Sequence, residues 1–303
     1  LTGRGENPLR QVPRFFVWQL PAALYRLRWT TLAVAGLFVV VAAVVATWIS
    51  RDPALIASLG SQVQLEYYAE VEFEGYYSEN PAAVFAGTVW TNNAWIAAQS
   101  VLFGITGIWP VMVLVQNAVA VGTAAAVLAA FDRIDTFFLF ILPHGQLELT
   151  CVFVAVAAGL HLFWSWVAPG PRTRGEALAS QGRALATVAI GLVFALAVAG
   201  VIEGFVTAQA WPWALKIGVG TAALAAFLVY MLVVGRRAVL RRALARARGC
   251  FQGAAAASGR RGARGGARGG RLGRRTREEE AGEAAGGERR GAAHRRPRAR
   301  RRT

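Results

Sequence analysis

The sequence predicts an all-α, polytopic membrane protein, a bundle of about six transmembrane helices with both termini in the cytoplasm. Three observations predict this fold class. Of the 303 residues, 55% are hydrophobic and only 17% are charged, whereas soluble proteins have about 25% charged residues. Apolar segments of about 20 residues, the length that crosses a bilayer, recur along the chain. The basic residues fall in alternate connections, as the positive-inside rule requires.

Six apolar segments have spanning length. They are residues 29–49, 83–104, 108–130, 145–168, 184–208 and 213–235. The second and third are separated only by "ITGIW", with Pro110 directly after it. We therefore expect these two spans to form a tight helical hairpin.

The connections between the spans set the orientation. Residues 1–28 carry five arginines and are expected to be a cytoplasmic N-terminal segment. Loop 50–82 has one arginine against six acidic residues and is expected outside. The connection 169–183 and the segment after residue 235 are basic and are expected inside. The transmembrane domain is therefore predicted over 29–235.

The net charge of +16 comes from residues 236–303. From Arg236 onward the chain has 22 basic and 5 acidic residues, whereas the preceding part has 11 and 12. This Arg/Gly-rich tail is expected to be disordered and cytoplasmic. Such a tail can bind anionic lipid or nucleic acid, but a solvated tail or a frameshifted sequence is the plainer interpretation, and no specific nucleic-acid partner is expected.

A histidine and two glutamates stand out within the spans, where ionisable groups are costly. His144 and Glu148, in "PHGQLEL", share one helix face. Glu203 lies at a similar depth on the outer side, because each helical residue adds about 1.5 Å. It sits between Gly200 and Gly204, whose spacing lets another helix approach closely.

We expect the three ionisable side chains to form one polar cluster at the outer face. Four roles remain open for it: a proton relay, a substrate contact, half of a metal site or structural polar bonds. Two of these ligands are too few for a closed zinc site, and the chain has no HExxH motif. The sequence therefore predicts no metal, no cofactor and no catalytic residue.

Two further sets of polar residues are candidates for function. The second and third spans carry amides that either hold helices together or line a midplane cavity: Asn92, Asn93, Gln99, Gln116 and Asn117. The acidic, tyrosine-rich outer loop is either a docking surface for a partner or an interfacial amphipathic helix. Its candidate residues are Glu66, Glu70, Glu72, Glu74 and Asn80.

Three segments resemble the hallmark segments of the stage II sporulation protein M family of polytopic membrane proteins. They are "YYSENPAAVFAGTVWTNNAWIAAQSVLFGITGI", "PHGQLEL" and "VIEGFVT", in this order. The resemblance covers about residues 10–240. It marks the following positions without assigning them roles: Asn80, Asn92, Asn93, His144, Glu148 and Glu203.

The resemblance implies a bacterial cytoplasmic-membrane protein that scaffolds a peptidoglycan hydrolase complex and has no catalytic activity. It also suggests RDD-type membrane proteins and MoxR-type ATPases as partners. We therefore expect a scaffold or regulator of cell-envelope remodelling whose partners are the bilayer and envelope proteins, and a homo-oligomer stays open. The alternative is a transporter or channel component that uses the His/Glu cluster and the midplane amides. An intramembrane hydrolase that uses His144 and Glu148 is a third hypothesis.

Overall fold

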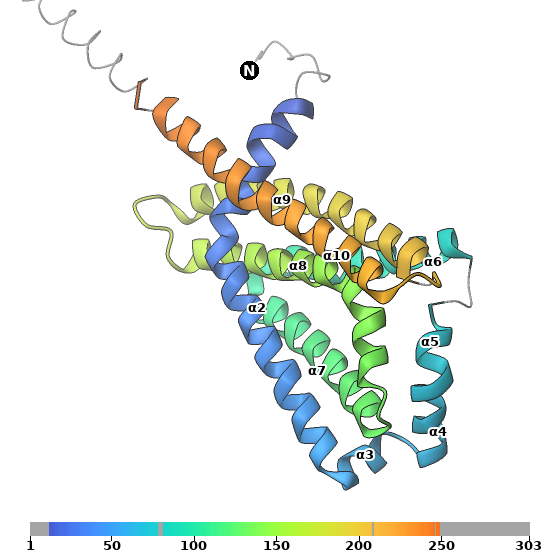
Figure 1. Ribbon diagram of the computed structural model, residues 1–303. Coiled ribbons are helices and arrows are strands. Elements are labelled where there is room, and N and C mark those ends of the chain that lie inside the picture. Colours follow the sequence, from blue (N-terminus) through green and yellow to red (C-terminus); the bar gives the residue numbers. More distant parts are fainter. Residues whose placement is uncertain (1–11, 78–80, 208, 246, 249–303) are drawn as a thin grey trace, which may run out of the picture. The chain divides into compact units, whose positions relative to one another are not determined.

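A computed structural model describes residues 12–77, 81–207, 209–245 and 247–248 (Figure 1). These residues form helices and turns and contain no strand, which confirms the all-α fold class. The chain divides into two compact units, Leu1–Leu240 and Arg241–Thr303. Nearly all of the described residues belong to the first unit, which contains the candidate site.

Six long helices account for most of the first unit. They are α2 (Leu20–Arg51), α6 (Ala82–Leu102), α7 (Ile108–Ala130), α8 (Ile134–Val167), α9 (Arg174–Ile202) and α10 (Trp213–Val229). The short helices α3 (Pro53–Leu59), α4 (Gln62–Tyr67) and α5 (Phe73–Gly75) lie between α2 and α6. The remaining turns are η1 (Phe15–Gln19), η2 (Tyr68–Glu72), η3 (Gly104–Thr106), η4 (Glu203–Thr207) and η5 (Tyr230–Val234).

Five of the described helices are long and apolar enough to cross a membrane. They are Val12–Arg51, Ile108–Ala130, Ile134–Val167, Arg174–Thr207 and Trp213–Ala245. The remaining predicted span, 83–104, corresponds to α6, whose 21 residues extend about 31 Å. Its asparagines and glutamine lower its hydropathy below that of the other five. The architecture is that of a multi-pass membrane protein, in agreement with the prediction of about six spans.

Two tryptophans bracket the apolar part of α2. Trp29 and Trp48 are 68% and 64% exposed to the surroundings of the protein. Nineteen helical residues separate them by about 28 Å, close to the thickness of a bilayer's hydrocarbon core. Tryptophan is enriched at both membrane interfaces. The pair therefore supports the predicted first span, 29–49, although α2 itself begins earlier, at Leu20.

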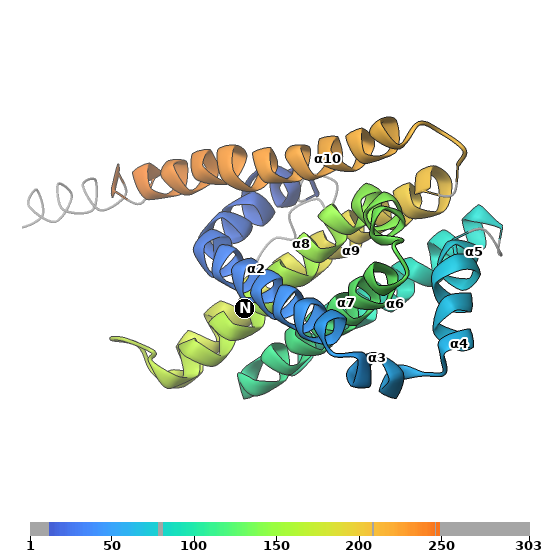
Figure 2. The ribbon, with the colours of Figure 1, turned by 60° about the horizontal axis from the view of Figure 1, so that its bottom comes forward.

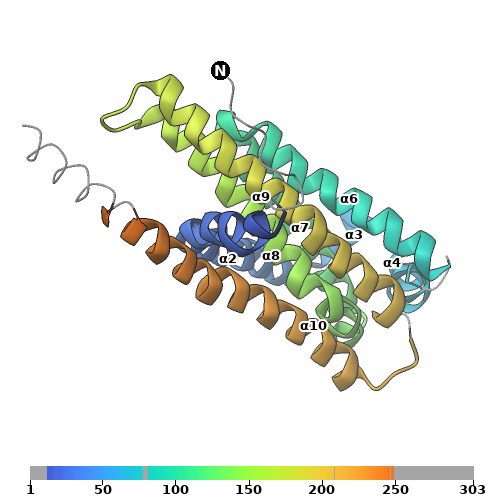
Figure 3. The same ribbon diagram turned by 90° about the horizontal axis from the view of Figure 1, so that it is seen from above.

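Helix α8 lies at the centre of the first unit. It packs against α2, α6, α7, α9 and α10, and every residue from Cys151 to Gly159 is buried. Figure 3 shows α8 between α9 and α10, and Figure 2 shows α2 and α7 side by side. Small residues allow this close packing. A Cβ at Gly122 of α7 would lie 2.6 Å from the Ala42 carbonyl oxygen of α2.

The helix that corresponds to the fourth predicted span, 145–168, begins well before residue 145. Helix α8 begins at Ile134 and continues through Pro143 to Val167. Proline has no N–H and its ring crowds the carbonyl four residues earlier, so it usually bends or breaks a helix. Here the bend is tolerated, and Figure 1 shows α8 changing direction in its N-terminal third. His144 therefore lies just after a kink and not at a helix start.

Helical structure extends beyond both ends of the predicted transmembrane domain, 29–235. Described residues from Val12 to Arg28 are helical, so the predicted cytoplasmic segment 1–28 is partly continuous with α2. Arg236–Leu240 and Arg241–Ala245 are helical as well, although both belong to the predicted tail. Most of that tail, residues 249–303, lies outside the described residues.

The described residues of the outer loop fold as short helices and turns. Asp52 caps α3, and Ser61 forms a reciprocal capping box with Gln64 at the start of α4. Aromatic residues hold the segment against the bundle. Phe73 and Tyr77 form a buried cluster with residues of α6, α7 and α8, namely Phe85, Val89, Leu128 and Phe137.

Candidate functional site

The structure brings together His144 and Glu148, just after the kink in α8, and Glu203, at the C-terminal end of α9. One ligand atom from each side chain lies within 4.8 Å of the other two. His144 and Glu203 are only 4% and 3% exposed, and Glu148 is half-buried. The His144 Nε2 atom is 3.6 Å from Glu203 Oε1. These three residues are called the His/Glu cluster below.

The two helices present these side chains through local irregularities. On α8, the kink at Pro143 directly precedes His144. On α9, the regular helix ends at Ile202, and Glu203 opens the π-helical turn η4. Such turns insert an extra residue per turn, redirect side chains and are frequent at functional sites.

The predicted glycine contact positions Glu203 against protein. A Cβ at Gly204 would lie 2.5 Å from the Ala82 carbonyl oxygen, and one at Gly200 would lie 2.9 Å from that of Ala86. The close neighbour of α9 is therefore α6, and Glu203 is covered by protein on the side that it shares with these glycines.

Thr207 and Lys216, which the sequence did not single out, complete the surroundings of His144. The Thr207 hydroxyl is 3.4 Å from His144 Nδ1 and donates to the Ile202 carbonyl oxygen at 3.4 Å. Lys216, on α10, is buried and donates from Nζ to the Thr207 carbonyl oxygen at 2.7 Å. Three helices thus converge on this histidine.

Tyr77 covers the His/Glu cluster from the outer segment. Its ring centroid is 5.9 Å from that of His144 and 5.0 Å from that of Phe140. Burial first, and then the nearby Glu203 carboxylate, raises the pKa of the Tyr77 phenol above its usual value of about 10. The phenol therefore stays neutral at physiological pH. The motif "YYSENP" contains Tyr77, but its sequence gave no sign of this contact.

One polar atom in the cluster has no partner. Glu203 Oε2 is buried and accepts no hydrogen bond from the described residues. A buried carboxylate oxygen without a donor or cation is unfavourable, and the penalty is of order 1–3 kcal/mol. Together with the short separation of the three ligand atoms, this indicates a site that suits a proton or a cation.

The structure does not gather the amides of α6 and α7 into one cavity. Asn93 is buried, Gln99 is half-buried, and Asn92 lies on an exposed face of α6. Gln116 is exposed on α7, and Asn117 Nδ2 donates to the Val113 carbonyl oxygen of its own helix at 2.8 Å. Asn92 and Gln116 border separate shallow grooves. The two amides thus face different parts of the surface, and their role in a translocation path stays a prediction.

The acidic residues of the outer loop divide into two groups. Glu66, Glu70 and Glu72 are exposed. Glu74 is half-buried and forms an ion pair with Arg133, at 2.5 Å between its Oε1 and the arginine Nη2. Asn80 lies outside the described residues.

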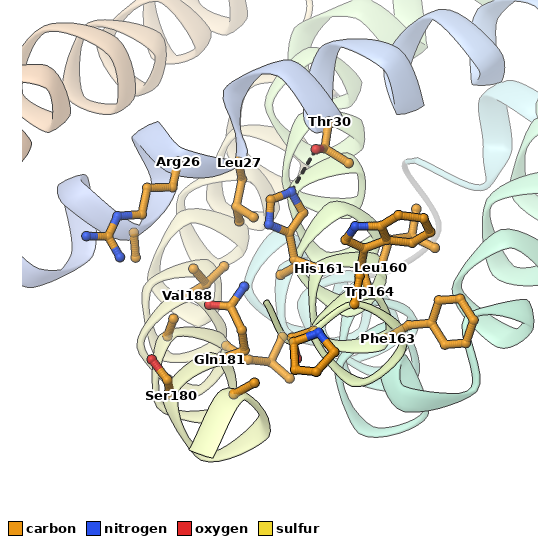
Figure 4. A pocket seen from close by; sticks show the side chains of 18 of the residues that line it. Arg26, Leu27, Thr30, Leu160, His161, Phe163, Trp164, Ser180, Gln181 and Val188 are labelled. Carbon is orange, nitrogen blue, oxygen red and sulfur yellow. Dashed lines mark hydrogen bonds between the residues drawn. The ribbon is translucent and has the colours of Figure 1, made fainter. Parts of the chain in front are cut away.

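A pocket lies between α2, α8 and α9, away from the His/Glu cluster (Figure 4). Its volume is about 790 Å³, and Arg26, Arg172 and Gln181 are among the residues that line it. In it, His161 Nε2 is 2.8 Å from the Thr30 hydroxyl. Thirteen residues of α8 separate His161 from Glu148, which corresponds to about 20 Å. His161 therefore does not belong to the cluster.

Comparison with protein families gives one result that bears on this site. The family model described as Stage II sporulation protein M matches residues 31–208. The matched region begins within α2 and ends directly after η4, so it contains all three members of the His/Glu cluster. No curated protein and no solved structure matches the chain.

Proposed function

The chain belongs to the stage II sporulation protein M family, and on this premise we propose that it is a non-enzymatic scaffold of the bacterial cytoplasmic membrane. In this proposal it recruits or regulates the machinery that remodels the cell envelope, and its partner is a peptidoglycan hydrolase or an associated membrane protein. Its outer segment faces that machinery, and both of its ends lie in the cytoplasm. The feature that carries the proposal is a surface on the outer segment.

This docking surface consists of Val63, Glu66, Tyr67, Glu70 and Val71. The three apolar residues recur every fourth position, so they share one helical face. Their exposed fractions are 77%, 58% and 49%. The two glutamates lie beside them and are exposed as well. An exposed apolar stripe bordered by carboxylates suits a partner segment that is apolar and basic.

The docking surface is held firmly, which a scaffold requires. On the opposite face, Leu65, Ala69 and Phe73 are buried. The ring of Phe73 stacks on Phe137 of α8, with centroids 6.3 Å apart. The ion pair between Glu74 and Arg133 adds a second attachment, to the turn before α8. A partner that binds this surface would therefore meet a preorganised segment and lose less entropy on binding.

The test is crosslinking of the native protein in membranes, followed by mass spectrometry of the captured proteins. Reversing the charges with Glu66→Lys and Glu70→Lys is expected to abolish capture of an envelope enzyme. Asp135→Lys reverses a single charge at an exposed position on α8 and is expected to leave capture intact. If the reversed protein is as abundant as wild type and captures the same envelope enzymes, the docking proposal is wrong.

A further inference from the structure

We propose that the His/Glu cluster binds one divalent transition-metal ion, of the Zn²⁺ or Mn²⁺ kind, through His144, Glu148 and Glu203. An imidazole nitrogen together with carboxylate oxygens is a donor set that suits such ions. His144 and Glu148 lie on α8, and Glu203 directly follows the last residue of α9, so the ion would join α8 to the end of α9. This site goes beyond the proposed scaffold function and does not depend on it.

The distances favour a bound ion over a direct hydrogen bond. His144 Nε2 and Glu203 Oε1 are 3.6 Å apart, beyond the range of about 2.7–3.2 Å for an N–H···O hydrogen bond. Two donors that each lie about 2.1 Å from a tetrahedral zinc ion are roughly 3.4 Å apart. The observed separation is close to that value. The remaining separations are at most 4.8 Å, so binding one ion would draw the glutamate side chains closer to it.

The surroundings of His144 leave its Nε2 atom available to bind a metal ion. The Thr207 hydroxyl lies 3.4 Å from His144 Nδ1, whereas Nε2 faces Glu203. In the proposed site, Nδ1–H turns toward Thr207 and the lone pair of the neutral imidazole is on Nε2. Metal-binding histidines almost always have such a partner on the second ring nitrogen.

Burial and charge also favour a bound cation. Glu203 is 3% exposed, and its Oε2 has no partner among the described residues. The nearby Lys216 donates from Nζ to the Thr207 carbonyl oxygen and not to a carboxylate. A divalent cation would neutralise both glutamates and give the orphaned oxygen a ligand.

The first measurement is elemental analysis of the protein purified in mild detergent without chelators. About one transition-metal ion per chain is expected. His144→Ala and Glu203→Gln should reduce the metal content to background. His161→Ala and Asp135→Asn are the matched controls, because they change a histidine of the same helix and an exposed carboxylate outside the cluster. Both controls should retain the ion.

A titration covers the case in which the ligand variants do not fold. The wild-type protein is stripped with a chelator and titrated with Zn²⁺ or Mn²⁺ while its thermal unfolding is followed. The midpoint is expected to rise with metal in the wild type. In Thr207→Val, which preserves side-chain shape, the affinity should fall about 10- to 100-fold.

The alternative occupant is a proton shared by the two carboxylates. In that case the native protein contains no stoichiometric metal and neither ion shifts its unfolding, which would overturn the proposal. Metal that stays bound in both His144→Ala and Glu203→Gln would overturn it equally, because it would lie elsewhere. Both measurements use the isolated protein, so their outcome is independent of whether a partner docks on the outer segment.

Discussion

At the scale of single residues, the contact between Tyr77 and His144 links the outer segment to the membrane-embedded cluster. The buried phenol has a raised pKa, so the folded protein prefers the neutral form more strongly than the unfolded chain does. Stability from this preference is complete below the unfolded pKa of about 10 and is lost as the pH rises above that value. Tyr68 and Tyr76 also have raised pKa values, chiefly through burial.

We therefore expect Tyr77→Phe to weaken the alkaline loss of stability. Phenylalanine keeps the ring contacts and removes the ionisable hydroxyl. The thermal midpoint of the wild type should fall as the pH rises above about 10, and that of Tyr77→Phe should fall less. Tyr67→Phe is the control, because Tyr67 is 58% exposed and its substitution should leave the wild-type profile unchanged. Identical profiles for Tyr77→Phe and the wild type would contradict the assigned burial.

The meeting of the three cluster residues could be predicted from the sequence, but their surroundings could not. Because each helical residue adds a fixed rise, the depth of His144, Glu148 and Glu203 in the membrane follows from their positions in the sequence. The contacts of Tyr77 and Lys216 depend instead on how the outer segment and α10 pack on the bundle. No local pattern records such long-range packing. Whether the cluster functions stays a prediction.

At the scale of helices, the kink in α8 lies in close contact with α10. Gly220 faces the carbonyl of Pro143 so closely that a Cβ there would overlap the backbone oxygen. Gly218, on the same helix, has no atom within 4 Å of its own would-be Cβ. Two glycines separated by two positions thus differ in whether they can accept a methyl group.

We expect opposite effects from alanine at these two positions. Gly220→Ala should lower the free energy of unfolding by about 1–3 kcal/mol, because the backbone of α8 must move. Gly218→Ala should raise it by up to about 1 kcal/mol, because alanine has the higher helix propensity. Unfolding of both variants in mixed micelles measures the difference. Equal effects, or a more stable Gly220→Ala, would show that α10 does not pack on Pro143 in this way.

The sequence located the helices better than it located their faces. The predicted fourth span begins after Pro143, whereas α8 continues through Pro143 with a bend, and Gly220 of α10 lies against the Pro143 carbonyl. The amides show the same limit. Their spacing on α6 was predictable, but the burial of Asn93 and the exposure of Asn92 depend on which neighbour covers each face. Periodicity alone gives the stripes of a helix and not the partner of each stripe.

At the scale of the whole molecule, the alternation of basic connections predicts which side of the membrane each loop occupies. Val63 in α4 is 77% exposed, and Gln209, between η4 and α10, is exposed too; both belong to connections expected outside. Arg172, in the turn between α8 and α9, is exposed and expected inside. These three positions can therefore report the orientation of the bundle without disturbing its core.

We expect single cysteines at these positions to be labelled according to side. In a Cys250→Ser background, the remaining native thiol, Cys151, is fully buried. A membrane-impermeant maleimide applied to spheroplasts should label Val63→Cys and Gln209→Cys, and should label Arg172→Cys only after lysis. The physical reason is that arginines in short connections hold them in the cytoplasm.

The opposite pattern would invert the orientation and place the docking surface away from the cell wall. Labelling of Val63→Cys without Gln209→Cys would show that an odd number of spans separates the two positions, and α6 would then not cross the membrane.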